Sequence, residues 1–141
     1  MRTFLAIPLP DEVKAQLTAA VQRLAPLAHE VKWCTKDQFH LTLAFLGEVS
    51  PAILPHLTEA ANRVCAALPA FKCRAYGFGF FGTKRNPKTL WAGIDLTPEL
   101  DALYERLWLE LGKFGYKNRE PDFRPHVTLG RCLESARNDA V

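Results

Sequence analysis

The sequence predicts a single domain of α-helices and β-strands that is built as two similar halves. Three observations support this fold class. Short β-prone segments alternate with amphipathic helical segments, the word His-x-Thr-Leu occurs twice, and each copy follows a strand, a helix and a connector in the same order. The chain has 141 residues, of which 48% are hydrophobic and 23% are charged, so its length and composition are those of one ordinary soluble domain.

The first part of the chain predicts a strand, a helix and a second strand. Residues 2–9 alternate in polarity and are β-prone. Asp11 is placed to cap the following helix, whose apolar side chains recur on one face until Pro26 ends it. Residues 27–38 are expected to form a connector, and residues 39–46 form the strand that carries the first His-x-Thr word.

The middle of the chain predicts a helix and a β-hairpin. Ser50 and Pro51 combine a capping hydroxyl with a proline at the first helical position, which is typical of a helix start. Residues 71–81 are expected to form a strand whose two glycines indicate a bulge or a close backbone approach. The returning strand is expected over residues 90–96, after a loop with three cations.

The last part predicts a third helix and a final strand. Thr97 and Pro98 start the helix, and Gly115 is its expected C-cap. A polar connector leads to Phe123-Arg124-Pro125 and the second His-x-Thr strand, after which the polar tail 134–141 shows no periodicity.

The two His-x-Thr words are the candidate functional residues. Because side chains alternate along a strand, His40 and Thr42 share one face of their strand, and His126 and Thr128 share one face of theirs. If the halves pack about a pseudo-twofold axis, the two faces turn towards each other. Similarity this short also arises by chance between strand–helix–strand units, but the shared word makes chance a poorer explanation. The apolar face of the first strand is expected to hold Phe39, Leu41, Leu43 and Phe45.

Two imidazoles facing one cleft can divide acid and base work. Histidine titrates near neutral pH, so that one ring can accept a proton while the other donates one. Threonine hydroxyls can donate to the oxygens of a small anion, and phosphate fits best because its charge spreads over several oxygens. For each pair alone, an ordinary strand histidine with a surface threonine remains the simpler interpretation.

His40-Leu41-Thr42-Leu43 and His126-Val127-Thr128-Leu129 resemble the paired HxTx motifs of the 2H phosphoesterase superfamily, and most closely its RNA 2′,3′-cyclic phosphodiesterases, also called 2′-5′ RNA ligases. The resemblance spans residues 2–132. It implies one bilobed α+β domain over residues 1–141, with antiparallel sheets lining a central cleft and helices outside. Relatives in this family continue past the second motif, so the chain is expected to be short at its C-terminus. A missing sheet edge would favour dimerisation over the monomer otherwise expected.

The resemblance implies hydrolysis of a terminal ribose 2′,3′-cyclic phosphate to a 2′-phosphomonoester, without a metal or cofactor. His40 would be the proton donor to the departing 3′ oxygen and His126 the base that activates water, although the symmetry makes the two interchangeable. Thr42 and Thr128 would hold the phosphate oxygens. The reverse reaction would join RNA ends by a 2′-5′ bond.

Other residues are weaker candidates for binding. Strict alternation puts Arg131 on the face away from His126, so either the strand bulges at Gly130 or Arg131 is structural. Arg124 lies on the His126 face by parity, unless Pro125 breaks the count. The cations of the 82–88 loop are positioned to follow an RNA backbone or are simply solvated, and Phe81 either stacks on a base or packs in the core. Packing is assigned to Trp33, Trp91 and Trp108, and a surface role to His29 and His56.

Three functional interpretations remain open from the sequence. The first is the metal-independent phosphodiesterase acting on RNA ends or small nucleotides. The second is a receptor for RNA ends or nucleotides that keeps the cleft without turnover, and the third is a metallohydrolase using His40, His126 and a cysteine. The net charge of +3 is compatible with a phosphate-bearing ligand. The sequence shows no membrane span or signal peptide, and its scattered cysteines (Cys34, Cys65, Cys73 and Cys132) are expected to be reduced thiols in a cytoplasmic protein.

Overall fold

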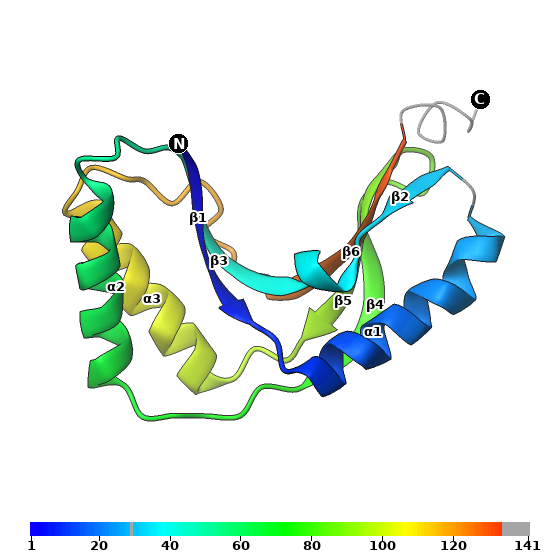
Figure 1. The fold of residues 1–141 in the computed structure, drawn as a ribbon, viewed down its shortest axis with the longest axis horizontal. Coiled ribbons are helices and arrows are strands. Elements are labelled where there is room, and N and C mark those ends of the chain that lie inside the picture. Colours follow the sequence, from blue (N-terminus) through cyan, green and yellow to red (C-terminus); the bar gives the residue numbers. More distant parts are fainter. Residues whose placement is uncertain (29, 134–141) are drawn as a thin grey trace. The chain divides into compact units, whose positions relative to one another are not determined.

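The structure is a computed structural model of the chain, and it describes residues 1–28 and 30–133. His29 and the tail 134–141, both interpreted from the sequence, lie outside the described residues. Within them the chain forms three α-helices and six strands, so the predicted α+β class is confirmed (Figure 1). In chain order these are β1 (Arg2–Pro8), α1 (Asp11–Leu24), β2 (Val31–Trp33), β3 (His40–Glu48), α2 (Leu54–Ala67), β4 (Ala75–Gly82), β5 (Pro87–Ile94), α3 (Pro98–Gly112) and β6 (His126–Cys132), with short 3₁₀-helices η1 (Ala25–Leu27) and η2 (Lys36–Gln38).

The strands are hydrogen-bonded in the order β1-β3-β6-β5-β4, and β2 also pairs with β6. The chain divides into two compact units, and both β1 and β3 pass from one to the other. Of the described residues, unit 1 comprises 1–6, 42–74 and 95–125, and unit 2 comprises 7–28, 30–41, 75–94 and 126–133.

Unit 1 is a strand pair packed against two helices. Helices α2 and α3 lie side by side (Figure 1), and the Trp108 indole of α3 donates a 3.2 Å hydrogen bond to the Leu43 carbonyl of β3. The buried side chains recur at helical spacing, which is why both segments form amphipathic helices. They are Leu57, Ala60 and Val64 in α2, and Leu100, Leu103, Tyr104, Leu107 and Leu111 in α3.

The start of α3 confirms the prediction, whereas the start of α2 corrects it. Thr97 is the N-cap of α3, and its hydroxyl accepts a 3.2 Å hydrogen bond from the Leu100 amide. Helix α2 begins at Leu54, not at Pro51, which lies in a preceding turn. The reason is Pro55, which has no amide hydrogen and is therefore tolerated only in the first turn of a helix.

Two smaller expectations in unit 1 are also wrong. Phe45 is 66% exposed because the burial alternation of β3 breaks at Leu43 and Ala44, which are both buried. Phe45 therefore faces solvent together with Phe4 of β1, and the centroids of these two rings are 6.2 Å apart. The C-cap of α3 is Lys113, although Gly115 does adopt the left-handed conformation that closes the following turn, with φ of 91°.

Unit 2 is an antiparallel sheet with helix α1. In it β6 pairs with β2 on one side along part of its length, with the start of β3 at Leu41, and with β5, which continues to β4. Helix α1 starts one residue after its N-cap Pro10, and Asp11 is the first helical residue and provides no side-chain cap, contrary to the sequence prediction. Among the described residues no helix is both long enough and apolar enough to cross a membrane.

The expected connector at residues 27–38 contains regular structure that was not predicted from the sequence. Val31–Trp33 form strand β2, with Val31 opposite Cys132 and Trp33 opposite Gly130 of β6. A three-residue strand is too short to show a period, so only its partner reveals it. Thr35 and Gln38 then form a capping box around η2, directly before the first His-x-Thr strand.

Candidate functional site

The two His-x-Thr strands are paired with each other. Leu41 of β3 lies opposite Val127 of β6 in an antiparallel register, so the central residues of the two words face one another. Leu41 is 2% exposed and Val127 is 1% exposed, so both side chains lie on the buried face of the sheet. Because side chains alternate, His40, His126 and Thr128 lie on the opposite face of this sheet.

The register fixes the spacing of the two imidazoles. One step along from the Leu41–Val127 pair, Thr128 lies across from His40. His126 is then the diagonal neighbour of His40, at the distance of about 7–8 Å that separates diagonal positions on neighbouring strands. Two imidazoles carried at this backbone spacing can reach a single tetrahedral group between them, and Thr128 lies across from His40 and two residues from His126.

A bulge in β6 returns Arg131 to the same face. Along β5, Trp91 pairs with Thr128 and Leu90 pairs with Gly130, so Leu129 is an extra residue on the β6 side. Leu129 and Gly130 are accordingly both buried. Arg131 lies opposite Thr89 and therefore shares the face of Thr128 and His126. Of the two alternatives that the sequence left for Arg131, the structure has the bulge.

Two aromatic side chains flank His126. The Phe81 ring meets the His126 ring edge-on at a centroid distance of 4.8 Å, and the Trp91 ring lies 6.2 Å away. Phe81 and Trp91 are also in contact with each other, at 5.4 Å. Gly79, opposite Trp91 on β4, leaves room for the indole because any Cβ there would overlap the ring. Trp91 therefore packs as predicted, but against the candidate site rather than in the core.

A basic residue of β2 that was not among the sequence-predicted candidates lies on this face. Lys32 lies directly opposite Arg131, and both side chains are exposed. Burial raises the pKa of the neighbouring Cys34 thiol, and the positive charges of Arg131 and Lys32 partly oppose that rise. No local signal could have revealed Lys32, because the three residues of β2 are too few to show a period.

The environment of His40 affects its protonation. Partial burial lowers the pKa of His40, because removing the ring from water disfavours the charged imidazolium. The free protein therefore holds more of the neutral imidazole at a given pH than an exposed histidine would. A bound anion next to the ring would shift that pKa back upward.

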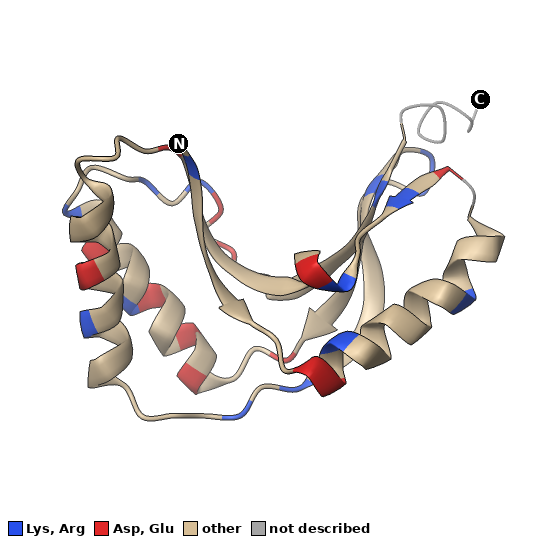
Figure 2. Ribbon diagram, in the orientation of Figure 1, with Lys and Arg blue, Asp and Glu red and all other residues tan. Residues whose placement is uncertain are grey.

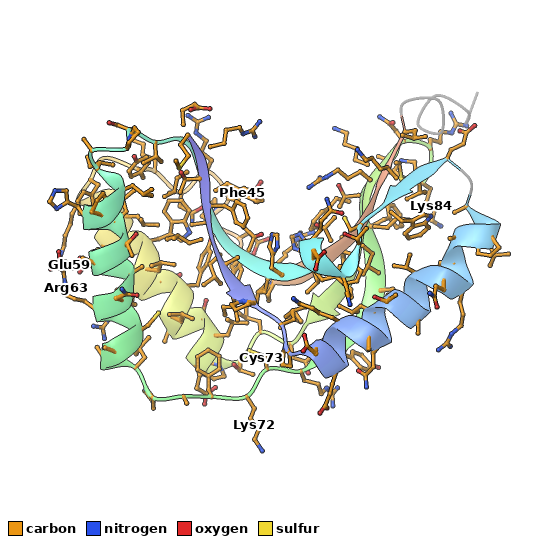
Figure 3. The ribbon with its side chains drawn as sticks, in the orientation of Figure 1. Phe45, Glu59, Arg63, Lys72, Cys73 and Lys84 are labelled. Atoms are coloured by element: carbon orange, nitrogen blue, oxygen red, sulfur yellow. The ribbon has the colours of Figure 1, made fainter. Side chains whose placement is uncertain are left out.

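Three other candidates from the sequence are Thr42, Arg124 and the cations of the 82–88 loop. Thr42 is half-buried and belongs to unit 1. Arg124 also belongs to unit 1, where it precedes β6 and forms a 3.5 Å ion pair with Asp122. The loop expected at residues 82–88 is shorter in the structure, because Gly82 ends β4 and β5 begins at Pro87. Lys84 and Arg85 of this hairpin and Lys88 of β5 are exposed, and Figure 3 labels Lys84. In the described part of the chain no group of three or more His, Cys, Asp or Glu side chains gathers as a metal site requires.

Comparison with known proteins identifies the family. The model of the 2′-5′ RNA ligase superfamily matches residues 3–141, so the chain belongs to this superfamily of 2H phosphoesterases. The resemblance inferred from the paired His-x-Thr words is thus confirmed.

Individual relatives agree with that assignment. The chain is 37% identical over 131 residues to the RNA 2′,3′-cyclic phosphodiesterase of Thermotoga maritima, covering 93% of this chain and 70% of that protein. It is 30% identical to the enzyme of the same name from Archaeoglobus fulgidus, covering 93% and 72%. Among solved structures, a protein of Thermus thermophilus matches with a TM-score of 0.83 at 32% identity, covering 94% and 74%. Escherichia coli LigT in its apo form matches with a TM-score of 0.71 at 30% identity, covering 94% and 73%.

Proposed function

We propose that this chain is an RNA 2′,3′-cyclic phosphodiesterase that hydrolyses a terminal 2′,3′-cyclic phosphate to a 2′-phosphomonoester. The observation that carries the proposal is the register Leu41–Val127, which puts His40 and His126 on one face at diagonal spacing. The names of the relatives at 30–37% identity support the same reaction. RNA ends and small nucleotides are the proposed partners, and the reverse reaction would form a 2′-5′ bond.

The proposed chemistry uses the two histidines as an acid and a base. His126 takes a proton from a water molecule, whose oxygen forms a bond to phosphorus. The bond from phosphorus to the ribose 3′ oxygen breaks, and His40 delivers a proton to that oxygen, so that no charge is left on the leaving group. The phosphate stays on the 2′ oxygen, and His126 ends protonated while His40 ends neutral.

The remaining candidate residues would hold the phosphate. Thr128 lies across from His40 by register, so its hydroxyl is close enough to donate to an oxygen of a group between the rings. We propose the same role for Thr42 on the grounds of the repeated word alone. Arg131, which the bulge returns to this face, is proposed to contact the substrate by charge.

Turnover of adenosine 2′,3′-cyclic phosphate in the presence of EDTA tests the proposal. We expect adenosine 2′-phosphate as the product, identified by ³¹P NMR, with no loss of rate from the chelator. His40→Ala and His126→Ala are each expected to lower kcat by about 10²–10⁴, as loss of a positioned acid or base does.

His56→Ala is the matched control, because His56 is an exposed histidine of α2 in unit 1. It should keep the parent rate. Binding without product would favour the receptor interpretation instead, and loss of activity with EDTA would favour the metallohydrolase. A histidine variant with the parent kcat would remove that residue from the mechanism.

A further inference from the structure

We propose that one end of the unit 2 sheet binds the phosphodiester that lies one nucleotide upstream of the reacting RNA end. RNA ends of two or more nucleotides would then be better substrates than mononucleotides. This inference rests on the proposed function and specifies the substrate class of the same site. We call the residues concerned the basic strip; they are Lys32, Lys84, Arg85, Lys88 and Arg131.

The centre of the basic strip is a pair of like charges held side by side. Lys32 of β2 and Arg131 of β6 are direct register partners, and Thr89 of β5 flanks Arg131 on its other side. Like charges directly opposite each other on neighbouring strands are destabilising. An anion between the two side chains would turn this repulsion into attraction.

The β4–β5 hairpin adds three cations at the same end of the sheet. Thr89, the partner of Arg131, comes directly after Lys88, so the hairpin leaves the sheet beside Arg131. Thr83 orders the hairpin, since its hydroxyl accepts a 2.9 Å hydrogen bond from the Asn86 amide. Figure 2 shows basic residues gathered over β2, β6 and this hairpin. Glu30, which directly precedes β2, is half-buried.

The basic strip has no carboxylate partner among residues 1–28 and 30–133. No ion pair there involves any of its five side chains. In unit 1, by contrast, cations are paired with carboxylates at 2.9–3.8 Å: Arg63 with Glu59 and Glu110, Arg74 with Asp95, Lys113 with Glu110, and Arg124 with Asp122. Exposed cations that gather at one end of a sheet without carboxylate partners favour phosphate binding.

The geometry selects the upstream phosphate as the ligand. Thr128 pairs with Trp91 and Arg131 pairs with Thr89, and Trp91 and Thr89 are two residues apart on β5, or about 6.5–7 Å. This is the scale of one nucleotide step along an extended strand. A cyclic phosphate sits at the 3′ end of an RNA, so every other phosphate lies on its 5′ side. A mononucleoside cyclic phosphate has no second phosphate for the basic strip to bind.

Two substrates and one variant test this inference. Adenosine 2′,3′-cyclic phosphate lacks the upstream phosphate, and the dinucleotide ApA with a terminal 2′,3′-cyclic phosphate has it. We expect the parent protein to show a kcat/KM about tenfold higher for the dinucleotide. Lys32→Met should reduce that ratio about fivefold to tenfold, through KM, which is the loss expected for one charge-assisted contact. The dependence of log(kcat/KM) on log salt for the dinucleotide should become shallower by about 0.7.

Lys72→Met is the matched control, because it removes the same charge from the exposed connector after α2 in unit 1 (Figure 3). It should leave the substrate ratio and the salt dependence unchanged. The inference is overturned if the parent protein does not prefer the dinucleotide. It is equally overturned if Lys32→Met affects both substrates alike, or if Lys72→Met has the same effect as Lys32→Met.

A binding measurement separates this inference from the proposed function. If neither substrate is hydrolysed, the proposed function fails, and calorimetry with the two 2′-phosphate compounds, adenosine 2′-phosphate and ApA 2′-phosphate, tests the basic strip by itself. A tighter Kd for the dinucleotide that Lys32→Met abolishes supports the strip. Equal Kd values for the two compounds overturn it.

Discussion

Substituting alanine at Gly79 tests how the sheet positions the candidate site. A Cβ at this position would overlap Cη2 and Cζ2 of Trp91 and would lie 3.0 Å from Cζ3. The Trp91 Nε1 atom is buried and has no hydrogen-bond acceptor within the described residues, so packing alone holds the indole. In Gly79→Ala the ring must therefore move, and it contacts both Phe81 and His126.

The expected losses of stability and of kcat in Gly79→Ala follow from overpacking of the Gly79–Trp91 contact. Inserting a methyl group into a packed contact costs about 1–3 kcal/mol. A chain of 141 residues unfolds with an entropy of about 0.3 kcal/mol/K at its Tm, so the expected decrease in Tm is about 3–10 °C. Movement of Trp91 also alters its contact with the His126 ring. Because the ring then leaves its productive position, we expect kcat to fall about tenfold to a hundredfold.

Thermal denaturation by circular dichroism and turnover of adenosine 2′,3′-cyclic phosphate measure the two effects. Gly112→Ala is the control, since a Cβ there meets no atom within 4 Å and alanine favours a helix. Trp91→Phe removes the ring atoms that the new methyl group would overlap. The double variant should therefore be more stable than the sum of the two single changes predicts, with a coupling of about 0.5–3 kcal/mol. Strict additivity, or a Gly79→Ala protein with the parent Tm and kcat, would refute the reasoning.

Four further predictions concern the site and the packing of unit 1. As the acid, His40 must carry a proton, and burial lowers its pKa. We therefore expect kcat/KM, measured as a function of pH, to fall as pH rises past a value below the usual histidine range. The corresponding fall in kcat should occur at higher pH, because the bound anion raises the pKa of His40. Thr128→Val should lower kcat about tenfold in steady-state assays, whereas Thr89→Val on the neighbouring strand should not. Thr97→Ala removes the N-cap of α3 and should cost about 1 kcal/mol in urea unfolding. Tyr104→Phe keeps the stacking on Phe123 but loses the hydroxyl that donates to the Glu120 carbonyl at 2.9 Å, for a cost of about 1–3 kcal/mol in the same assay.

The sequence predicted those elements whose signal is local. Helix α3 shows both the cap and the period of its buried side chains within its own residues, and its start at Thr97-Pro98 is confirmed. The strands of the two His-x-Thr words were found for the same reason. The family was also identified from these words and their flanking residues, because the doubled motif is specific.

The missed features depend on partners that are distant in sequence. Strand β2 exists because three residues find β6, and the face of Arg131 is set by the register of β5 against β6. No window of the sequence contains that information. The exposure of Phe45 likewise follows from two successive buried residues in β3, which strict alternation does not anticipate. Lys32 became a candidate only when its partner Arg131 was known.

The position of β6 in the strand order has a consequence for how the protein folds during synthesis. This strand is the last element to leave the ribosome among those described, yet it pairs with β2, β3 and β5. Until His126–Cys132 emerge, these earlier strands lack the backbone hydrogen bonds that they make to β6 in the folded protein. Such late, long-range closure is slow, and it exposes nascent strands to association with other chains. A nascent chain that stalls before residue 126 would therefore be a better chaperone client than the finished protein.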